Sequence, residues 1–158
     1  MLIRNAVTAD TQALAGLVTS LAGYFQDDPS QPLPAWFSDT LTPDAFNARL
    51  SSDKQLNLVV EIDGSIAAYL SLQRPDYLYH LFVADAFHGR GLARQLWQRA
   101  MALCPAERYL VRSSLYAVPV YQKLGFVSHG EVGHRDGISY QPMEFFSLKP
   151  AGQQPQSS

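Results

Sequence analysis

The sequence predicts an α/β (α+β) domain built on one mixed, mostly antiparallel sheet of about seven strands, with about four helices over its two faces. Two observations predict this fold. Three segments rich in β-forming residues, 56–62, 65–73 and 77–83, follow one another directly, which favours antiparallel pairing. A helical pattern over 89–103 and a strand pattern over 108–112 come next. This strand–helix–strand order favours one parallel pair.

The N-terminal part holds a strand and a helix. Residues 1–6 are typical of a short first strand, and Thr8 or Asp10 is placed to cap a helix over about 11–23. The apolar stripe of this helix consists of Leu14, Leu17, Val18 and Leu21.

Proline residues mark the next two segments. Three prolines fall within 29–34, so we expect residues 27–34 to form a loop. Thr42 followed by Pro43 is typical of a helix start, and we expect this short helix to end near Leu50.

Turn signals divide the rest of the chain. Asp63-Gly64 predicts a hairpin between the first two central strands. A short helix over 118–124 is expected to stop at Gly125, and two strands, 126–132 and 139–148, complete the sheet. We therefore expect residues 1–148 to form a single domain. The polar, proline-containing residues 149–158 are expected to form a disordered tail.

Composition excludes several classes of protein. The chain has 158 residues, of which 47% are hydrophobic and 16% charged, as in an ordinary globular domain. Its net charge of -2 disfavours nucleic acid as the main partner. No apolar run is long enough for a membrane span, and the N-terminus does not resemble a signal peptide, so we expect a cytoplasmic protein. The single cysteine, Cys104, is expected to be structural.

The segment His88-Gly-Arg-Gly-Leu-Ala93 carries the clearest chemical signal. It joins an apolar strand that ends at Val83 to an amphipathic helix. The first amides of a helix lack internal acceptors, and the helix dipole places partial positive charge there. Gly89 and Gly91 let a phosphate approach the backbone, and Arg90 adds positive charge. The segment is therefore suited to bind a pyrophosphate. A dinucleotide-binding fingerprint would need a third glycine at Arg94.

Two linked motifs resemble the GNAT superfamily of acyltransferases. His88-x-x-Gly91-x-Ala93 is similar to the family's Gln/Arg-x-x-Gly-x-Gly/Ala and departs from it at the first position. Tyr121-Gln-Lys-Leu-Gly-Phe126 is similar to the family's second motif, Tyr-x-Lys-Leu-Gly-Phe. Many members carry Asn near the start of that segment, where Arg112 and Ser114 stand here. The resemblance covers roughly residues 1–148, since motif order, spacing and strand order agree.

The resemblance implies an N-acetyltransferase that binds acetyl-CoA and uses no metal. The pantetheine would lie between the strand that ends at Val83 and the strand at 108–112, against backbone groups of Phe82 and Val83. The pyrophosphate would lie on His88, Gly89, Arg90, Gly91, Leu92 and Ala93, with Ser114 as a further contact. Tyr121 would be the general acid that protonates the departing thiolate.

The general base stays open at this stage. The candidates are Tyr77, Tyr79, His80, Glu131 and His134, and a water relay is an alternative. Strand alternation places Tyr77 and Tyr79 on one face and His80 on the other, unless a bulge intervenes. The stretch 131–136 lacks a tight set of metal ligands and is expected to be a solvated loop.

The resemblance leaves the acceptor open between a small-molecule amine and a peptide or protein. Two acids, Asp27 and Asp28, could attract a cationic amine. Four aromatic residues could cover the acceptor site or belong to the core: Tyr24, Phe25, Trp36 and Phe37. Alternatives are a non-catalytic acetyl-CoA sensor, a toxin acting on aminoacyl-tRNA, and transfer of a larger acyl group. By analogy with the family, the late strands could pair two copies into a homodimer.

Overall fold

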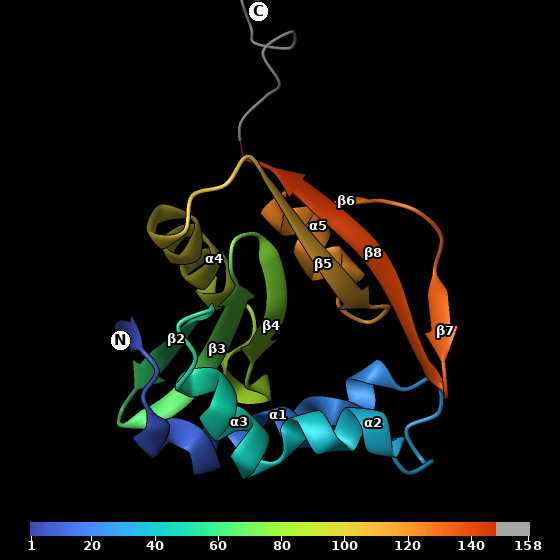
Figure 1. The fold of residues 1–158 in the computed structure, drawn as a ribbon, viewed down its shortest axis with the longest axis horizontal. Helices are drawn as coiled ribbons and strands as arrows, with labels where there is room; N and C mark the ends of the chain where they lie inside the picture. Colours follow the sequence, from blue (N-terminus) through green and yellow to red (C-terminus); the bar gives the residue numbers. More distant parts are fainter. Residues whose placement is uncertain (148–158) are drawn as a thin grey trace, which may run out of the picture.

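The computed structural model describes residues 1–147 and shows one eight-stranded sheet with helices on both faces (Figure 1). The strand order is β1-β2-β3-β4-β5-β8-β6, with β7 paired to β8. The predicted mixed, mostly antiparallel sheet is confirmed. The strands are β1 (Leu2–Asn5), β2 (Gln55–Ile62), β3 (Ser65–Gln73), β4 (Tyr77–Val83), β5 (Arg108–Ser114), β6 (Val127–Ser128), β7 (Gly133–Arg135) and β8 (Ile138–Phe146). The α-helices are α1 (Thr11–Leu21), α2 (Ala35–Ser38), α3 (Pro43–Leu50), α4 (Leu92–Leu103) and α5 (Val118–Leu124).

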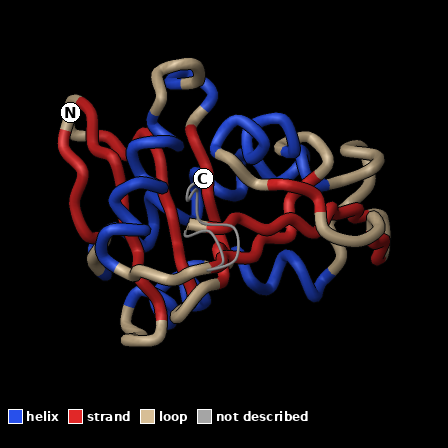
Figure 2. Tube along the Cα trace, turned by 90° about the horizontal axis from the view of Figure 1, so that it is seen from above, coloured by secondary structure: helices blue, strands red, loops and turns tan. Residues whose placement is uncertain are grey.

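The sheet splits between β4 and β5, the one parallel pair in the described part of the chain. Only two residue pairs join these strands, Tyr77 with Leu110 and Leu78 with Val111. Beyond them β4 continues along β3, whereas β5 continues along β8. Figure 2 shows the two groups of strands running in different directions. The backbone of the second half of β4 therefore has no strand neighbour on the β5 side.

A bulge in β4 decides which side chains face the helices. His80 pairs with Ser71 and Leu78 pairs with Leu72, so Tyr79 is an extra residue in the ladder. The rings of Tyr79 and His80 lie 4.4 Å apart. The bulge thus brings together two side chains that strict alternation would separate.

Two cores cover the two faces of the sheet. One lies under α4 and α5 and includes Trp97, Tyr109, Phe126 and Met143. The other lies under α1 and α3 and includes Leu14, Phe46, Tyr69 and Phe82. Cys104 is buried within the first core, as expected of a structural thiol, and its Sγ lies 2.6 Å from Nη1 of Arg74. Within residues 1–147, no helix combines the length and the apolar character that crossing a membrane requires.

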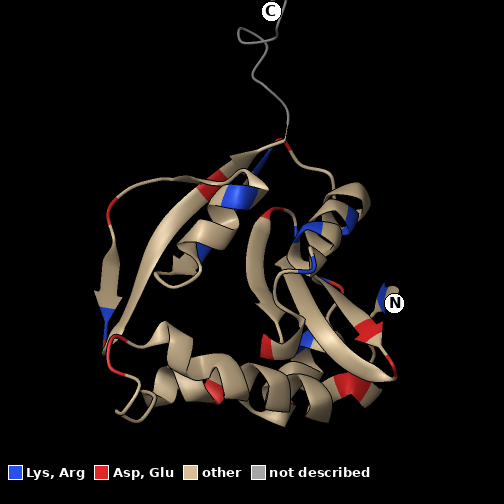
Figure 3. Cartoon of the chain, turned by 180° about the vertical axis from the view of Figure 1, so that it is seen from behind, with Lys and Arg blue, Asp and Glu red and all other residues tan. Residues whose placement is uncertain are grey.

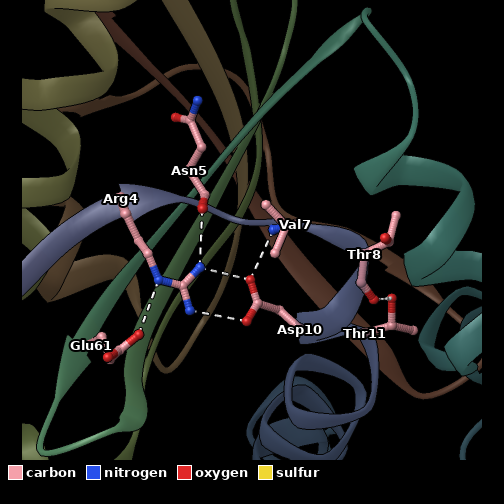
Figure 4. A network of polar contacts seen from close by, with 7 residues as sticks. All are labelled: Arg4, Asn5, Val7, Thr8, Asp10, Thr11 and Glu61. Carbon is pink, nitrogen blue, oxygen red and sulfur yellow. Dashed lines mark hydrogen bonds and ion pairs between the residues drawn. The ribbon is translucent and has the colours of Figure 1, made fainter.

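An ion-pair network joins β1 to the start of α1 (Figure 4). The guanidinium of Arg4 donates to both carboxylate oxygens of Asp10, at 2.8 and 3.0 Å, and to Glu61 at 3.0 Å. Arg4 holds the pKa of Asp10 below its usual value. Asp10 is the N-cap residue of α1, as one of the two alternatives predicted, but its carboxylate makes no capping hydrogen bond there, because it accepts from Arg4 and from the amide of Val7.

Backbone angles explain where two other predictions differ from the structure. The helix expected over 89–103 begins only at Leu92, because Gly89 and Gly91 have positive φ angles of 79° and 75°. The strand expected over 126–132 is limited to β6, since the chain turns at Gly130, with φ 91°.

The stretch 131–136 is only partly the expected loop. It contains β7, whose hairpin with β8 turns at Asp136 and Gly137, with φ of 51° and 82°. This is a second Asp-Gly turn, of the kind recognised at residues 63–64. The expected tail, 149–158, and the end of the strand predicted to reach residue 148 lie outside the described residues.

Candidate active site

A cavity of about 600 Å³ lies where β4 and β5 separate. It extends from the loop before α4 to the end of α1, and side chains of α5 form part of its wall. The structure brings nearly all the predicted site residues to this cavity: His80, Phe82, Val83, His88, Gly89, Gly91, Leu92, Ala93, Ser114 and Tyr121. Arg90 does not line it, because its guanidinium lies over the ring of Phe87, 5.0 Å from the centroid. The sequence therefore located this cavity well.

The loop before α4 forms one end of the cavity. Gly91 caps α4 in a left-handed conformation, and the first helical hydrogen bond runs from Gln95 N to Gly91 O. The amides of residues 92–94 consequently have no acceptor within the helix. A Cβ added at Gly89 or Gly91 would meet no atom within 4 Å, so open space surrounds these positions. Free amides, the helix dipole and open space together suit a phosphate group.

Basic residues surround this loop and fix its position. Arg94 donates through Nη2 to the carbonyl of Lys123 at 2.7 Å, which joins α4 to α5 beside the cavity. Figure 3 shows Lys and Arg on α4, on α5 and in the loop before α4, as well as on other elements of the fold. Positive charge thus gathers at the end of the cavity where a pyrophosphate would lie.

His88 stands at the position where the family motif has Gln or Arg. Its Nε2 lies 2.8 Å from the carbonyl oxygen of Val83, so this ring nitrogen carries the hydrogen and donates. The side chain therefore ties the loop back to the end of β4. It also occupies the Val83 carbonyl, a backbone group that we expected the pantetheine to use.

Tyr121 lies on α5 and reaches the cavity from the side of the larger core. Its side chain is 7% exposed and packs edge-on against Phe126, with ring centroids 5.4 Å apart. Burial, with a smaller contribution from Tyr77, raises its pKa well above the ordinary value. The hydroxyl therefore stays protonated at neutral pH and acts as a donor.

His80 lies on β4, on the opposite wall. It is 8% exposed, and its Nε2 is buried without a hydrogen-bond partner in the described part of the chain. Burial, and next the charge of Arg49, lowers its pKa to about 3. The imidazole is therefore neutral at physiological pH.

Of the other candidate bases, the fold places only one at the cavity. Tyr79 lines the cavity beside His80, whereas Tyr77, Glu131 and His134 do not. His134 instead contacts Ser139, with Nδ1 and Oγ 2.7 Å apart. No group of side chains in residues 1–147 could hold a metal ion.

A pair of stacked tyrosines crosses the wide end of the split. Tyr24, just after α1, stacks on Tyr116, just after β5, with ring centroids 4.1 Å apart. The Tyr24 hydroxyl donates to Asp85, just after β4, at 3.2 Å. Sequence reasoning missed Tyr116 and Asp85, because only the tertiary fold brings the ends of β4 and β5 together.

The segment between α1 and α3 docks on the β7–β8 hairpin. The amide of Asp27 donates to Gly137 O at 2.8 Å, and Ser139 Oγ donates to the Asp27 carboxylate at 2.6 Å. Trp36 Nε1 donates to Asp136 at 2.8 Å. Asp27 is thus already engaged, and the carboxylate of Asp28 accepts from Ser30.

The four aromatic residues of this segment serve different purposes. Tyr24 and Phe25 line the cavity, and Phe25 also packs on Phe37, with centroids 5.3 Å apart. Trp36 faces the hairpin, where the guanidinium of Arg135 lies 4.0 Å from its ring centroid.

Comparisons with known proteins agree with this geometry. The family model described as "Acetyltransferase (GNAT) domain" matches residues 24–146. A GCN5-related N-acetyltransferase from Rhodopseudomonas palustris has 23% identity and a TM-score of 0.74, over 92% of this chain and 94% of that one. A GNAT-family acetyltransferase from Streptococcus pneumoniae has 25% identity and a TM-score of 0.62, over 92% and 98%.

A third solved structure is the PaiA N-acetyltransferase from Thermoplasma acidophilum in complex with coenzyme A. It has 14% identity and a TM-score of 0.71, over 92% of this chain and 98% of that one. No curated protein matches the chain at a significant level of sequence similarity.

Proposed function

The chain belongs to the GNAT acetyltransferase family, and we propose that it transfers an acetyl group from acetyl-CoA to a primary amine by direct attack of the amine nitrogen. The observation that carries the proposal is a single cavity that combines a glycine loop suited to a phosphate with a protonated tyrosine. The loop with Gly89 and Gly91 lies at one end, and the protonated Tyr121 lines its wall.

The chain's own residues support the binding of acetyl-CoA. Free amides at the start of α4 would hold the pyrophosphate. The backbone of β4 at Phe82 and Val83 would lie along the pantetheine, because no strand pairs with it on the β5 side, but the Val83 carbonyl is already engaged by His88. Ser114 is 5% exposed and its Oγ accepts from the amide of Ala117, so it would contribute mainly by shaping the wall.

Tyr121 would supply the proton for the thiolate. As the amine nitrogen forms its bond to the acetyl carbon, the carbon–sulfur bond breaks and the electron pair leaves on sulfur. The raised pKa keeps the proton on the phenol until negative charge develops beside it. The transfer then gives CoA thiol and an amide.

The acceptor amine must lose a proton before it attacks. His80, with a pKa of about 3, holds a proton poorly, so it would serve as a hydrogen-bond acceptor that orients the amine and not as the group that removes its proton. We therefore assign the removal of the proton to water rather than to His80.

Calorimetry and a thiol-release assay with Tyr121→Phe test the proposal. The variant should bind acetyl-CoA within about twofold of the wild type but release CoA about a hundredfold more slowly in the presence of an amine. Tyr109→Phe is the matched control, because Tyr109 is buried, donates to Cys104 O, and does not line the cavity. Binding without turnover on any amine would indicate a sensor, and absence of binding would sink the proposal.

A further inference from the structure

Two arginines lie on the face of the sheet opposite α4 and α5, and no acid pairs with either. In the described chain, acidic side chains lie within ion-pair distance of Arg4, Arg108 and Arg135, but not of Arg49 or Arg112. Arg112 lines the cavity. Arg49 lies outside the cavity lining, with its guanidinium 5.4 Å from the Tyr79 ring centroid; its Nη2 donates to the carbonyl of Thr40, and its Nε is buried without a partner. Guanidinium groups in such places commonly bind a carboxylate or phosphate.

The strand register places Arg112 beside the reacting atoms. Val111 belongs to the core under α4 and α5, so alternation turns Arg112 to the opposite face. Val111 is also the last β5 residue paired with β4, so Arg112 stands where the two strands begin to separate. The phosphate-binding loop lies at the other end of the cavity, so the acyl end of acetyl-CoA would lie near Arg112 and Tyr79.

The Arg112 side chain is exposed and lies against an aromatic ring. Its guanidinium lies over the ring of Tyr140, 5.1 Å from the centroid. Tyr140 pairs with Gly133 of β7, where any Cβ would collide with the tyrosine ring, so glycine is needed for this packing. A guanidinium that already packs on a ring and has no acid partner loses little further conformational freedom when it binds an anion.

We propose that Arg112 binds the carboxylate of the acceptor, and that the acceptor is a free amino acid acetylated on its α-amine. This inference rests on the proposed function and names its substrate class. A carboxylate close to the nitrogen would meet Arg112 while the amine faces the acyl group. The positive charge of Arg49, which the carboxylate on Arg112 does not neutralise, would also disfavour a bound ammonium and so help the amine to become neutral without a strong base. The apolar wall formed by Leu21, Phe25 and Phe82 suits an apolar side chain.

Matched acceptors test the proposal. Initial rates would be measured with L-phenylalanine, L-phenylalaninamide and phenethylamine, which share the ring and the amine but differ in the carboxylate. We expect the wild type to favour phenylalanine by about tenfold or more in kcat/KM. Arg112→Gln should remove most of that preference, and Arg112→Lys should keep part of it, because Lys retains the charge but not the planar fork. Preference of the wild type for either analogue that lacks the carboxylate would overturn the proposal.

Controls separate this inference from the proposed function. Arg108→Gln removes the same charge at the other end of β5, outside the cavity, and should leave the preference unchanged. Arg112→Gln should bind acetyl-CoA as the wild type does, and weaker binding would make Arg112 a cofactor contact instead. If no amine is acetylated, the proposed function fails. Calorimetry of L-phenylalanine against the CoA-bound protein then still decides whether Arg112 binds a carboxylate.

Discussion

The two faces of the sheet differ in how they treat the split between β4 and β5. Under α4 and α5 the core continues across the split, with Leu78 on one side and Tyr109, Val111 and Met143 on the other. Under α1 and α3 the core includes residues of β2, β3 and β4 but none of β5 or β8. Apolar packing on one face therefore holds the halves together, whereas on the other face the apolar core does not extend across the split.

The second face is joined across the split by polar contacts instead. The segment from Tyr24 to Trp36 touches the β5–β8 half through a tyrosine stack and hydrogen bonds to the β7–β8 hairpin. Such contacts contribute about 1 kcal/mol each, less than a buried aromatic side chain. The difference teaches that the two halves of the sheet are held together mainly by apolar packing on the α4 and α5 face, which leaves the proposed acceptor site to the other face.

Removal of the Trp97 side chain should disrupt the apolar face and cause the largest loss of stability among these predictions. Trp97 is 1% exposed, and its ring lies 4.8 Å from Tyr109 and 5.2 Å from Phe126, both on the β5 side of the split, whereas its helix α4 packs on β2, β3 and β4 on the other side. Trp97→Ala should lower the free energy of unfolding by about 3–5 kcal/mol in urea denaturation. Trp97→Phe keeps a ring and removes an N–H that has no partner, so it should cost much less. Equal losses in the two variants would contradict the packing argument.

The buried His80 on the other face should make stability depend on pH. Its folded pKa of about 3 lies below the unfolded value of 6.5, so the unfolded state binds the proton first as the pH falls. Its contribution is complete above pH 6.5 and is lost between 6.5 and 3, by about 2 kcal/mol between pH 7 and pH 5. Thermal melts at the two pH values should show a smaller drop for His80→Gln than for the wild type. The same drop in both proteins would show that His80 is not buried in this way.

The polar contacts across the split should give the smallest effect on stability. Trp36→Phe removes the hydrogen bond to Asp136 and keeps most of the ring, so it should cost about 1 kcal/mol. We expect KM for the acceptor to rise by a small factor. The affinity for acetyl-CoA should stay the same, because Trp36 lies away from the glycine loop before α4. A change in acetyl-CoA binding alone would mean that this segment serves the cofactor.

Much of the cofactor end was accessible from the sequence. Gly89, Gly91 and the Tyr121 motif are local patterns whose backbone angles and spacing depend on neighbouring residues. The acceptor end was not accessible in the same way. From the sequence, Tyr79 and His80 were candidate general bases on opposite faces of one strand. Only the register between β3 and β4, with its bulge, brings them together. The role proposed for Arg49 depends on a contact between α3 and β4, which are far apart in the chain.

By itself, the sequence determined the order of the elements, the position of the glycine loop before α4 and the family. These follow from hydrophobic periodicity and from glycines placed where the backbone adopts positive φ angles that other residues rarely adopt. Tertiary structure alone decided where β4 parts from β5, where the bulge falls, and which charged side chains stand without a partner. These features depend on contacts between distant segments, which local propensity does not encode.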